Sequence, residues 1–538
     1  MNFLLQIIAS LLGALALIIF CFAVKSIYSN LTSPLRFLPG PKNASWLFGN
    51  LRQIQAADTA VLHEQWVEEY GPTMRYQGFF NTLRLYTIDT KALNHVLMNH
   101  YTYQKPEMAA YNLSQVLGSG ILIMEEDKHK MQRKVMNPAF GAAQIRELTD
   151  VFIEKSLQLR DIWAAQISQE GASAKLDVLS WLSRMTLDVI GLAGFNYKFD
   201  ALNPEGEINE LNRAFNLIFG DGNRFDFWGL LQAFFPVLRV LPSARPAAIG
   251  QAMNTMTRIG SEILRDSKSS LAGTGEKGNN WRARDLLSVL LRSNMDTNLP
   301  EDQRMSDEDV ISQVPTFLVA GHETTSTAVT WALYALSQDK AVQTKLRDEL
   351  FTLSTDNPTM DELNSLPYLD AVVRETLRVH APVPSTIRVA VKDDILPLGT
   401  PYRDVNGVMH DSILVKKGQT LFIPIVAMNR NKQIWGEDAK EFKPERWEKV
   451  PETVAAIPGV WGNLLTFLGG ARSCIGYRFS LVEMKALLYT LVRAFEFELG
   501  VPIEDIGKKS AVVTRPFLKS EPKQGSQLPL IVKSYQRS

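Results

Sequence analysis

The residues best suited to chemistry lie near the C-terminal end of the chain, in the segment Phe467–Gly476, which reads Phe-Leu-Gly-Gly-Ala-Arg-Ser-Cys-Ile-Gly. Cys474 directly precedes an amphipathic run, Tyr477–Phe495, that predicts a helix. The positive N-terminal end of that helix and its free N–H groups would stabilise a thiolate. Arg472 adds a fixed cation suited to a carboxylate on a ligand. The alternative is a buried, inert cysteine, and the local chemistry does not decide between the two.

A second candidate group is the hexapeptide Ala-Gly-His-Glu-Thr-Thr at 320–325, inside a segment, 306–337, that we expect to be the longest helix. Glycine and consecutive threonines weaken a helix interior, and the hydroxyl of Thr324 can bond to a carbonyl one turn earlier. Pro315 also removes an amide donor. We therefore expect a locally opened helix with a groove for a small molecule and a water. The alternative is a glycine kink in a packing helix, and His322 is expected to be packed or on the surface.

The spacing of the cysteine segment identifies a family. Phe467-x-x-Gly470-x-Arg472-x-Cys474-x-Gly476 resembles the haem-thiolate signature of the cytochrome P-450 monooxygenases. In that family the thiolate is the axial ligand of the haem b iron and pushes electron density toward O–O cleavage. Phe467, Arg472 and Gly476 are then expected to bind the cofactor, and Gly470 and Gly476 to turn the backbone tightly against this flat ligand.

The hexapeptide is similar to the oxygen-binding Ala-Gly-x-Glu-Thr-Thr motif of the same family. The resemblance implies that Thr324 holds a proton-donating water and that Glu323 feeds the proton relay. His322 is not expected to bind iron.

Two further basic positions resemble residues that bind the haem propionates. Arg133, in a predicted helix over 126–136, matches the arginine of the family motif Trp-x-x-x-Arg, although His129 stands where the tryptophan would be. A solvated basic face is the alternative. Arg388 follows Ala-Pro-Val-Pro-Ser-Thr-Ile and resembles the second propionate arginine.

A third motif is structural. Glu375 and Arg378 lie three residues apart on one face of a predicted helix, which by itself would fit an exposed ion pair worth on the order of a few tenths of a kcal/mol. Together with Arg446, in Phe-Lys-Pro-Glu-Arg-Trp, they resemble the buried Glu–Arg–Arg cluster of the family. The resemblance implies that the cluster locks the cysteine loop below the haem, so that losing one member would strand a buried charge.

Composition sets outer limits. With 538 residues, 46% of them hydrophobic, the chain can bury a large core. Its 57 basic and 57 acidic residues balance, so the chain has no net positive charge that would attract nucleic acid. A disulfide between Cys21, in an apolar run, and Cys474 is not expected, which fits a reducing compartment.

The N-terminus predicts a membrane anchor. The apolar run Phe3–Val24 has about the 20 residues that a spanning helix needs. A cleaved signal peptide fits less well, because the charged start and the cleavage site are missing. Lysines and arginines follow the span and none precedes it, which places the body of the protein in the cytosol. We expect a single-pass protein of the endoplasmic reticulum membrane, with an anchor at 1–25, a stiff, non-helical proline-rich linker at 26–42 and a haem-thiolate domain at 43–538.

The predicted fold is mainly α-helical with small β-sheets, as in the cytochrome P-450 haem-thiolate fold. Hydrophobic periodicity and turn residues predict its elements. These are a hairpin at 73–87, helices at 91–99, 126–136, 142–168, 176–193 and 306–337, loops at 101–120 and 273–280, a strand before Arg388, and a terminal hairpin from 512–514 and 528–532.

The segment 213–241 is rich in aromatic residues and broken by glycines and a proline. Two interpretations stand: part of the core, or a lid that dips into the membrane surface and admits apolar substrate.

The expected reaction inserts one atom of O2 into a hydrophobic small molecule. Electrons would come from NADPH through a membrane-bound flavoprotein reductase, because the chain has no Gly-rich dinucleotide motif. Lysines around Arg133 offer a docking site for an acidic electron donor, with cytochrome b5 as a further candidate. The cysteine loop and the helix after it look most like fungal members, which favours a terpenoid or other secondary metabolite, or an aromatic xenobiotic, over a fatty acid or sterol. The rivals are a haem-thiolate isomerase, dehydratase or peroxygenase without a reductase, and a non-catalytic membrane-tethered protein that binds haem or lipid.

Overall fold

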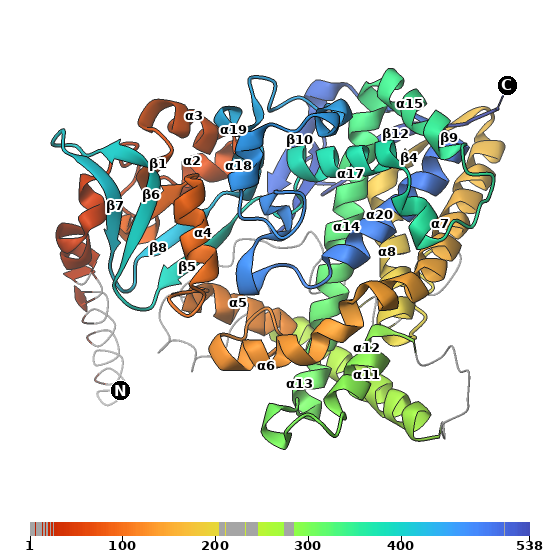
Figure 1. The fold of residues 1–538 in the computed structure, drawn as a ribbon, viewed down its shortest axis with the longest axis horizontal. Helices are drawn as coiled ribbons and strands as arrows, with labels where there is room; N and C mark the ends of the chain where they lie inside the picture. Colours follow the sequence, from red (N-terminus) through yellow and green to blue (C-terminus); the bar gives the residue numbers. More distant parts are fainter. Residues whose placement is uncertain are drawn as a thin grey trace. The chain divides into compact units, whose positions relative to one another are not determined.

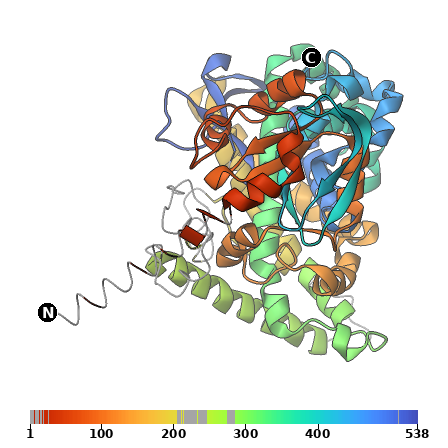
Figure 2. The same cartoon turned by 90° about the vertical axis from the view of Figure 1, so that its left-hand side faces the viewer.

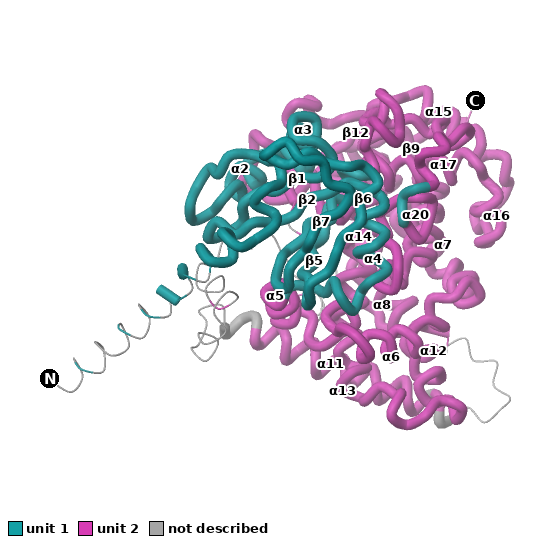
Figure 3. The backbone as a smooth tube through the Cα atoms, turned by 60° about the vertical axis from the view of Figure 1, so that its left-hand side comes forward, with its two compact units in different colours: residues 1–106, 385–428, 456–458 teal, residues 107–384, 429–455, 459–538 magenta. Residues whose placement is uncertain are grey.

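The structure is a computed structural model of the chain. It describes residues 6, 13, 17, 20–21, 23–24, 26–203, 210, 213, 232, 246–273, 284–510 and 512–537. Most of the predicted anchor, of the aromatic segment 213–241 and of the loop 273–280 therefore lies outside the described residues. The chain divides into two units (Figure 3), one formed by Met1–Pro106, Ser385–Met428 and Ala456–Pro458 and the other by Glu107–Pro384, Asn429–Ala455 and Gly459–Ser538.

The first unit is built on a five-stranded sheet with the strand order β1-β2-β8-β5-β3. Only the pair of β2 and β8 is parallel. In β1, Thr73, Met74, Tyr76 and Gln77 are buried and Arg75 is half-buried, so side chains on both faces of this strand are largely covered. The elements are η1 (Pro34–Phe37), α2 (Leu51–Ala56), α3 (Val61–Tyr70), β1 (Thr73–Gln77), η2 (Phe79–Asn81), β2 (Leu83–Thr87), α4 (Thr90–Met98), β3 (Tyr103–Gln104), β5 (Thr386–Ala390), β6 (Asp394–Arg403), β7 (Met409–Val415) and β8 (Thr420–Ile423).

An aromatic cluster joins α3 to this sheet. The ring of His63 lies against those of Tyr86 of β2 and Phe422 of β8, with centroid distances of 5.2 and 5.0 Å, and these two rings are themselves 5.7 Å apart. Trp66 and Tyr76 meet the same ring edge-on. The imidazole is thus enclosed by apolar surface, and its Nε2 atom is buried without a hydrogen-bond partner.

The second unit is mainly helical. Its central helix, α14, packs against α8 and α20, and α20 also packs against α7 (Figure 1). The long helix α11 meets α13 and α14 (Figure 2). The helices are α5 (Glu107–Leu117), α6 (Glu126–Met136), α7 (Ala142–Glu170), α8 (Val178–Phe195), α11 (Pro246–Gly273), α12 (Leu286–Asn294), α13 (Asp307–Ile311), α14 (Gln313–Gln338), α15 (Lys340–Leu350), α16 (Met360–Asn364), α17 (Pro367–Val379), α19 (Lys432–Trp435) and α20 (Tyr477–Ala494), with α18 (Ile425–Asn429) at the boundary of the units.

Two small sheets complete this unit. In the three-stranded sheet β4-β12-β9, the last strand of the chain lies in the middle, antiparallel to both neighbours. β10 and β11 form a separate antiparallel hairpin. The strands are β4 (Ser173–Asp177), β9 (Phe495–Leu499), β10 (Ile506–Ser510), β11 (Thr514–Leu518) and β12 (Pro529–Ser534). The predicted pairing of 512–514 with 528–532 is wrong, because β11 pairs with its neighbour in sequence at a small loop-closure cost, while β12 pairs with β4 and β9.

Most predicted elements of the N-terminal half are confirmed. The hairpin at 73–87 corresponds to β1 and β2, and the four helices predicted between 91 and 193 correspond to α4, α6, α7 and α8. The loop predicted at 101–120 is wrong, since it contains β3 and the helix α5, whose polar residues weaken the sequence signal. The non-helical linker is also wrong in part: η1 is a 3-10 helix, and the amide of Arg75 in β1 bonds to the carbonyl of Pro39 at 2.9 Å.

The helix predicted at 306–337 is divided at Ser312 into α13 and α14. Pro315 explains the division, because a proline ring clashes with the carbonyl four residues earlier, and that residue is Ile311, the last of α13. With 26 residues, α14 is shorter than α7, which has 29, so the expectation that it is the longest helix is wrong.

Within the described part of the chain, one helix, α8, is long and apolar enough to cross a membrane, by length and composition alone. Most of α8 is buried against other helices, as expected of a core helix.

Candidate active site around Cys474

The cysteine loop is held by its own backbone. The amide of Cys474 donates a 2.8 Å hydrogen bond to the carbonyl of Phe467, which closes the loop before α20. Gly470 has a φ of 67°, so the tight turn predicted there is confirmed. Gly476, with a φ of −90° and a ψ of 14°, also lies in a turn, at 475–476, but this conformation is open to any residue and does not require glycine. Phe467 is buried, with its ring between those of Trp461 and Tyr477.

Cys474 is a free cysteine that is exposed as a residue, although protein atoms surround its thiol densely. Such an arrangement fits a recess in the protein better than a convex surface. Burial raises the pKa of the Cys474 thiol, while the amide of Gly476 and the positive charge of Arg133 oppose the rise. A bound cation would favour the thiolate further, because a coordinating thiol is deprotonated.

The hexapeptide lies on α14, and one face of that helix is accessible there. Ala320 is exposed and Glu323 and Thr324 are half-buried, whereas His322 and Thr325 are buried. The hydroxyl of Thr324 donates to the carbonyl of Ala320 at 2.7 Å, as expected from the sequence. The predicted opening of the helix is wrong, because α14 stays regular through this stretch.

Gly321 serves helix packing. A Cβ atom on Gly321 would lie 2.8 Å from Cδ1 and 2.9 Å from Cγ1 of Ile190 on α8. The glycine therefore allows α8 and α14 to approach closely.

The carboxylate of Glu323 has two partners in the second unit. One oxygen lies 3.3 Å from Nε2 of His322, and the other accepts a hydrogen bond from the guanidinium group of Arg515 on β11. Sequence analysis missed Arg515, which is 192 residues away along the chain and has no local motif.

Two of the predicted propionate-binding residues adjoin the cysteine loop. Arg133 on α6 donates to the carbonyl of Ser473, next to Cys474, and burial lowers the pKa of Arg133. Arg472 donates to the carbonyl of Met124 and to the carboxylate of Glu125, and burial lowers the pKa of Arg472 to about 10.

The other two predicted residues lie apart from these contacts. His129 is buried on α6. Arg388 belongs to the first unit, where its guanidinium group bonds to the hydroxyl of Thr386 at 3.0 Å and the carbonyl of Ile387 at 2.8 Å. Burial lowers the pKa of Arg388 to about 10. The roles of both residues stay predictions.

The residues present fit a thiolate-ligated haem. Such a haem needs a free thiol as its axial ligand, an open face where O2 can bind, and cations for its propionates. Cys474 supplies an accessible thiol, and α14 has an accessible face at Ala320 and Thr324. Arg133 and Arg472, both in the second unit, supply the positive charge.

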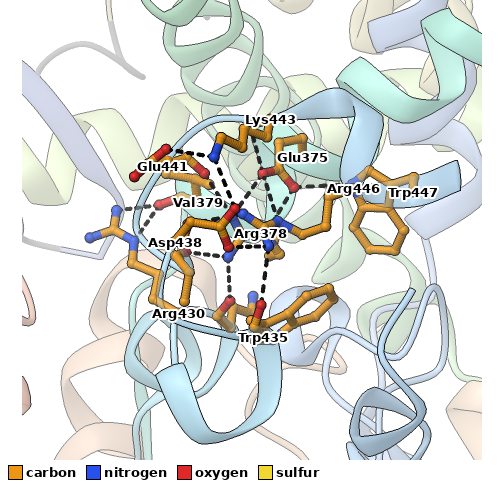
Figure 4. Close-up of polar contacts among 12 residues, drawn as sticks. Glu375, Arg378, Val379, Arg430, Trp435, Asp438, Glu441, Lys443, Arg446 and Trp447 are labelled. Atoms are coloured by element: carbon orange, nitrogen blue, oxygen red, sulfur yellow. Dashed lines mark hydrogen bonds and ion pairs between the residues drawn. The ribbon is translucent and has the colours of Figure 1, made fainter. Parts of the chain in front are cut away.

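The structure brings Glu375, Arg378 and Arg446 together in one buried cluster (Figure 4). Arg378 donates to both oxygens of Glu375, each at 2.8 Å, and the side chains of both residues are 0% exposed. Arg446 lies 3.4 Å from Glu375 and makes a shorter ion pair, of 2.7 Å, with Asp438. The indole of Trp447 donates to Glu375 at 3.1 Å.

A chain of hydrogen bonds links this cluster to the cysteine loop. Arg378 donates to the carbonyl of Asn429 at 3.0 Å, and the Asn429 side-chain amide donates to the hydroxyl of Thr466 at 2.8 Å. Thr466 precedes Phe467, whose carbonyl accepts from the amide of Cys474. Sequence analysis missed Asn429, for which no family motif was identified.

Comparison with known proteins agrees with this site. The family model "Cytochrome P-450" matches residues 39–520. The chain is 58% identical over 508 residues to cytochrome P-450 monooxygenase 205 of Postia placenta, covering 94% of each chain. It is 55% identical over 513 residues to cytochrome P-450 monooxygenase 128 of the same fungus, again covering 94% of each. It is 36% identical over 526 residues to cytochrome P-450 monooxygenase claO of Ampulloclitocybe clavipes, covering 93% of each. The match to the family model and these fungal relatives show the family, and the cysteine loop and the motif on α14 agree with it. The chain belongs to the cytochrome P-450 family of monooxygenases.

Proposed function

We propose that this monooxygenase hydroxylates or epoxidises a hydrophobic small molecule, a terpenoid or other secondary metabolite or an aromatic xenobiotic, with electrons derived from NADPH. The observation that best supports an oxygen-inserting site is the accessible Cys474 thiol in the same unit as the accessible face of α14. Bound haem supplies the iron centre at which O2 is activated.

The proposed cofactor contacts are those that membership of the family implies. Cys474 would hold the haem iron through its sulfur, with Phe467 and Gly476 in the loop around it. Arg133 and Arg472 would bind the propionates, with His129 as a further contact, whereas the same role for Arg388 is proposed from the family resemblance alone. Burial favours this role, because a guanidinium group in a low-dielectric site interacts strongly with a carboxylate.

The proposed proton path uses two residues of α14. The hydroxyl of Thr324 donates a hydrogen bond to the carbonyl of Ala320, which leaves the hydroxyl oxygen free to accept a hydrogen bond from a water. Glu323 is partly accessible, with a side chain 13% exposed, so it can exchange protons with solvent. Together they hold a water and pass protons to it.

We further propose a flavoprotein reductase as the electron donor, with cytochrome b5 as a second donor. Lys128, Lys130 and Lys134 are exposed on α6, the helix that also carries Arg133. These lysines suit an acidic partner surface. The anchor at 1–25 would hold the enzyme on the cytosolic face of the endoplasmic reticulum membrane, close to a membrane-bound reductase.

The first experiment tests the thiolate. Cys474→Ala should abolish the red-shifted Soret band of the reduced carbonyl complex, whereas Cys21→Ala, the matched control, should keep it. A normal band in Cys474→Ala would refute the assignment.

The second experiment tests the reaction. Purified enzyme and reductase are supplied with NADPH and panels of terpenoids, polycyclic aromatics, fatty acids and sterols, after spectral titration with each. We expect NADPH-dependent product with a terpenoid or aromatic compound. Product that forms without NADPH and reductase would instead indicate an isomerase, a dehydratase or a peroxide-driven enzyme.

A further inference from the structure

The C-terminal hairpin β10–β11 reaches the acid of the oxygen motif. Arg515 on β11 forms an ion pair with Glu323 on α14. The side chains are 22% and 13% exposed, so the pair lies at the edge of the accessible face and not in bulk solvent. Ion pairs in such partly buried settings are less screened than surface pairs.

Three further contacts fix the hairpin within the second unit, two of them with Trp331 of α14. The indole of Trp331, six residues after the oxygen motif on α14, donates to the carbonyl of Thr514 at 2.7 Å. The ammonium of Lys508 on β10 lies 5.0 Å from the centroid of the same indole ring. The amide of Thr514 donates to the carbonyl of Pro382 at 2.8 Å. The backbone that carries Arg515 is thus tied to the helix that carries Glu323.

The two partners of Glu323 differ in charge. Burial lowers the pKa of His322, so its ring is neutral near pH 7. The guanidinium group of Arg515, which stays protonated, is then the positively charged partner of this carboxylate. Neither contact involves Thr324, whose hydroxyl donates to Ala320.

We propose that Arg515 is a positioning residue for oxygen activation: by holding the Glu323 carboxylate, it makes proton delivery depend on the β10–β11 hairpin. In this step, the Glu323 carboxylate takes up a proton from solvent at its accessible edge beside Arg515 and passes it to the water held by Thr324, and that water gives one of its own protons to the oxygen atom that leaves as water. Without the guanidinium group the carboxylate leaves this position, and small displacements of a catalytic group reduce rates strongly. The inference rests on the proposed role of Glu323.

The test compares Arg515→Met with Arg515→Lys and with a matched control, Lys519→Met. Lys519 is an exposed residue just after β11, and its replacement by Met removes one positive charge, as Arg515→Met does. In the haem-loaded enzyme with reductase, Arg515→Met should lower product formed per NADPH about tenfold, with more peroxide and with KM unchanged. Arg515→Lys should restore part of the loss, and Lys519→Met should match the wild type.

A double variant separates positioning from general damage. If Arg515 acts through Glu323, then Arg515→Met should have no further effect in a Glu323→Gln background. The carbonyl complex and the thermal midpoint of each variant report folding independently. Additive losses, or an unchanged ratio of product to NADPH in Arg515→Met, would overturn the inference alone. A wild type that consumes no NADPH with any substrate would overturn the proposed function, and this inference with it.

Discussion

Arg378 binds both carboxylate oxygens of Glu375 through two hydrogen bonds of 2.8 Å, with both side chains wholly buried. The other donors of Arg378 bond to backbone carbonyls, among them that of Glu441 at 2.9 Å. The pair is therefore fully satisfied, which is the condition under which a buried ion pair persists in spite of its desolvation cost.

Arg378→Met should destabilise the protein by about 3–5 kcal/mol, because it leaves the Glu375 carboxylate buried without its main partner. The measurement is denaturant unfolding of the haem-loaded enzyme. The control is Arg146→Met, which breaks an exposed pair with Asp361 and should cost less than about 1 kcal/mol. Equal losses in the two variants would contradict the structural role of the cluster.

Gly321→Ala should destabilise the contact of α8 with α14, since the new methyl group would meet Ile190 at 2.8 Å. Overpacking of this kind costs about 1–3 kcal/mol. In an Ile190→Ala background the clash is removed, and the same substitution should stabilise by up to about 1 kcal/mol through helix propensity. A loss of the same size in both backgrounds, measured by thermal unfolding, would argue against packing as the role of this glycine.

The aromatic cluster of the first unit predicts an acid-sensitive stability. Burial lowers the pKa of His63 from 6.5 to about 4. Between these values the unfolded chain binds a proton that the folded chain does not, so stability is lost as the pH falls through this window. The loss should reach about 3 kcal/mol below pH 4. His63→Phe should remove this acid dependence in unfolding measured from pH 7 to 4, whereas Tyr86→Phe should keep it.

A buried carboxyl group predicts the opposite dependence. Glu483 on α20 is 0% exposed, and neither of its oxygens has a hydrogen bond of good geometry. Burial raises the pKa of Glu483 well above its ordinary value, opposed by the hydroxyl of Thr325. The folded chain keeps this proton after the unfolded chain has lost it, so stability falls as the pH rises from the ordinary value toward the raised one.

Glu483→Gln should remove that dependence and should gain stability over the wild type as the pH rises. Unfolding of both proteins across the pH range provides the test, with Glu452→Gln, the same change on an exposed residue, as the control for loss of a charge. A constant difference between wild type and Glu483→Gln at all pH values would contradict the prediction.

The sequence predicted those helices and contacts that depend on residues close together in the chain. The spacing of Glu375 and Arg378 on one helix face, the bond from Thr324 to Ala320, and the helix after Cys474 follow from residues within one or two turns of each other. The division of the 306–337 segment also has a local cause, the effect of Pro315 on the carbonyl of Ile311, but the sequence analysis expected one continuous helix there.

Contacts between distant segments were not predictable in this way. The pair of Arg515 with Glu323 spans 192 residues, and that of Arg472 with Glu125 spans 347. Neither is marked by periodicity or composition, and both depend on how the helices of the second unit pack. The wrong pairing of the last strand has the same cause, since several partners suit a short apolar segment equally well.

The middle position of β12 has a consequence for biosynthesis. β4 is made some 350 residues before its partner, and β9 also waits for the last strand. Until β12 has been translated, both have an unpaired edge that invites intermolecular pairing. A nonsense mutation just before Pro529 would leave this sheet without its central strand and expose the enzyme to aggregation and quality control.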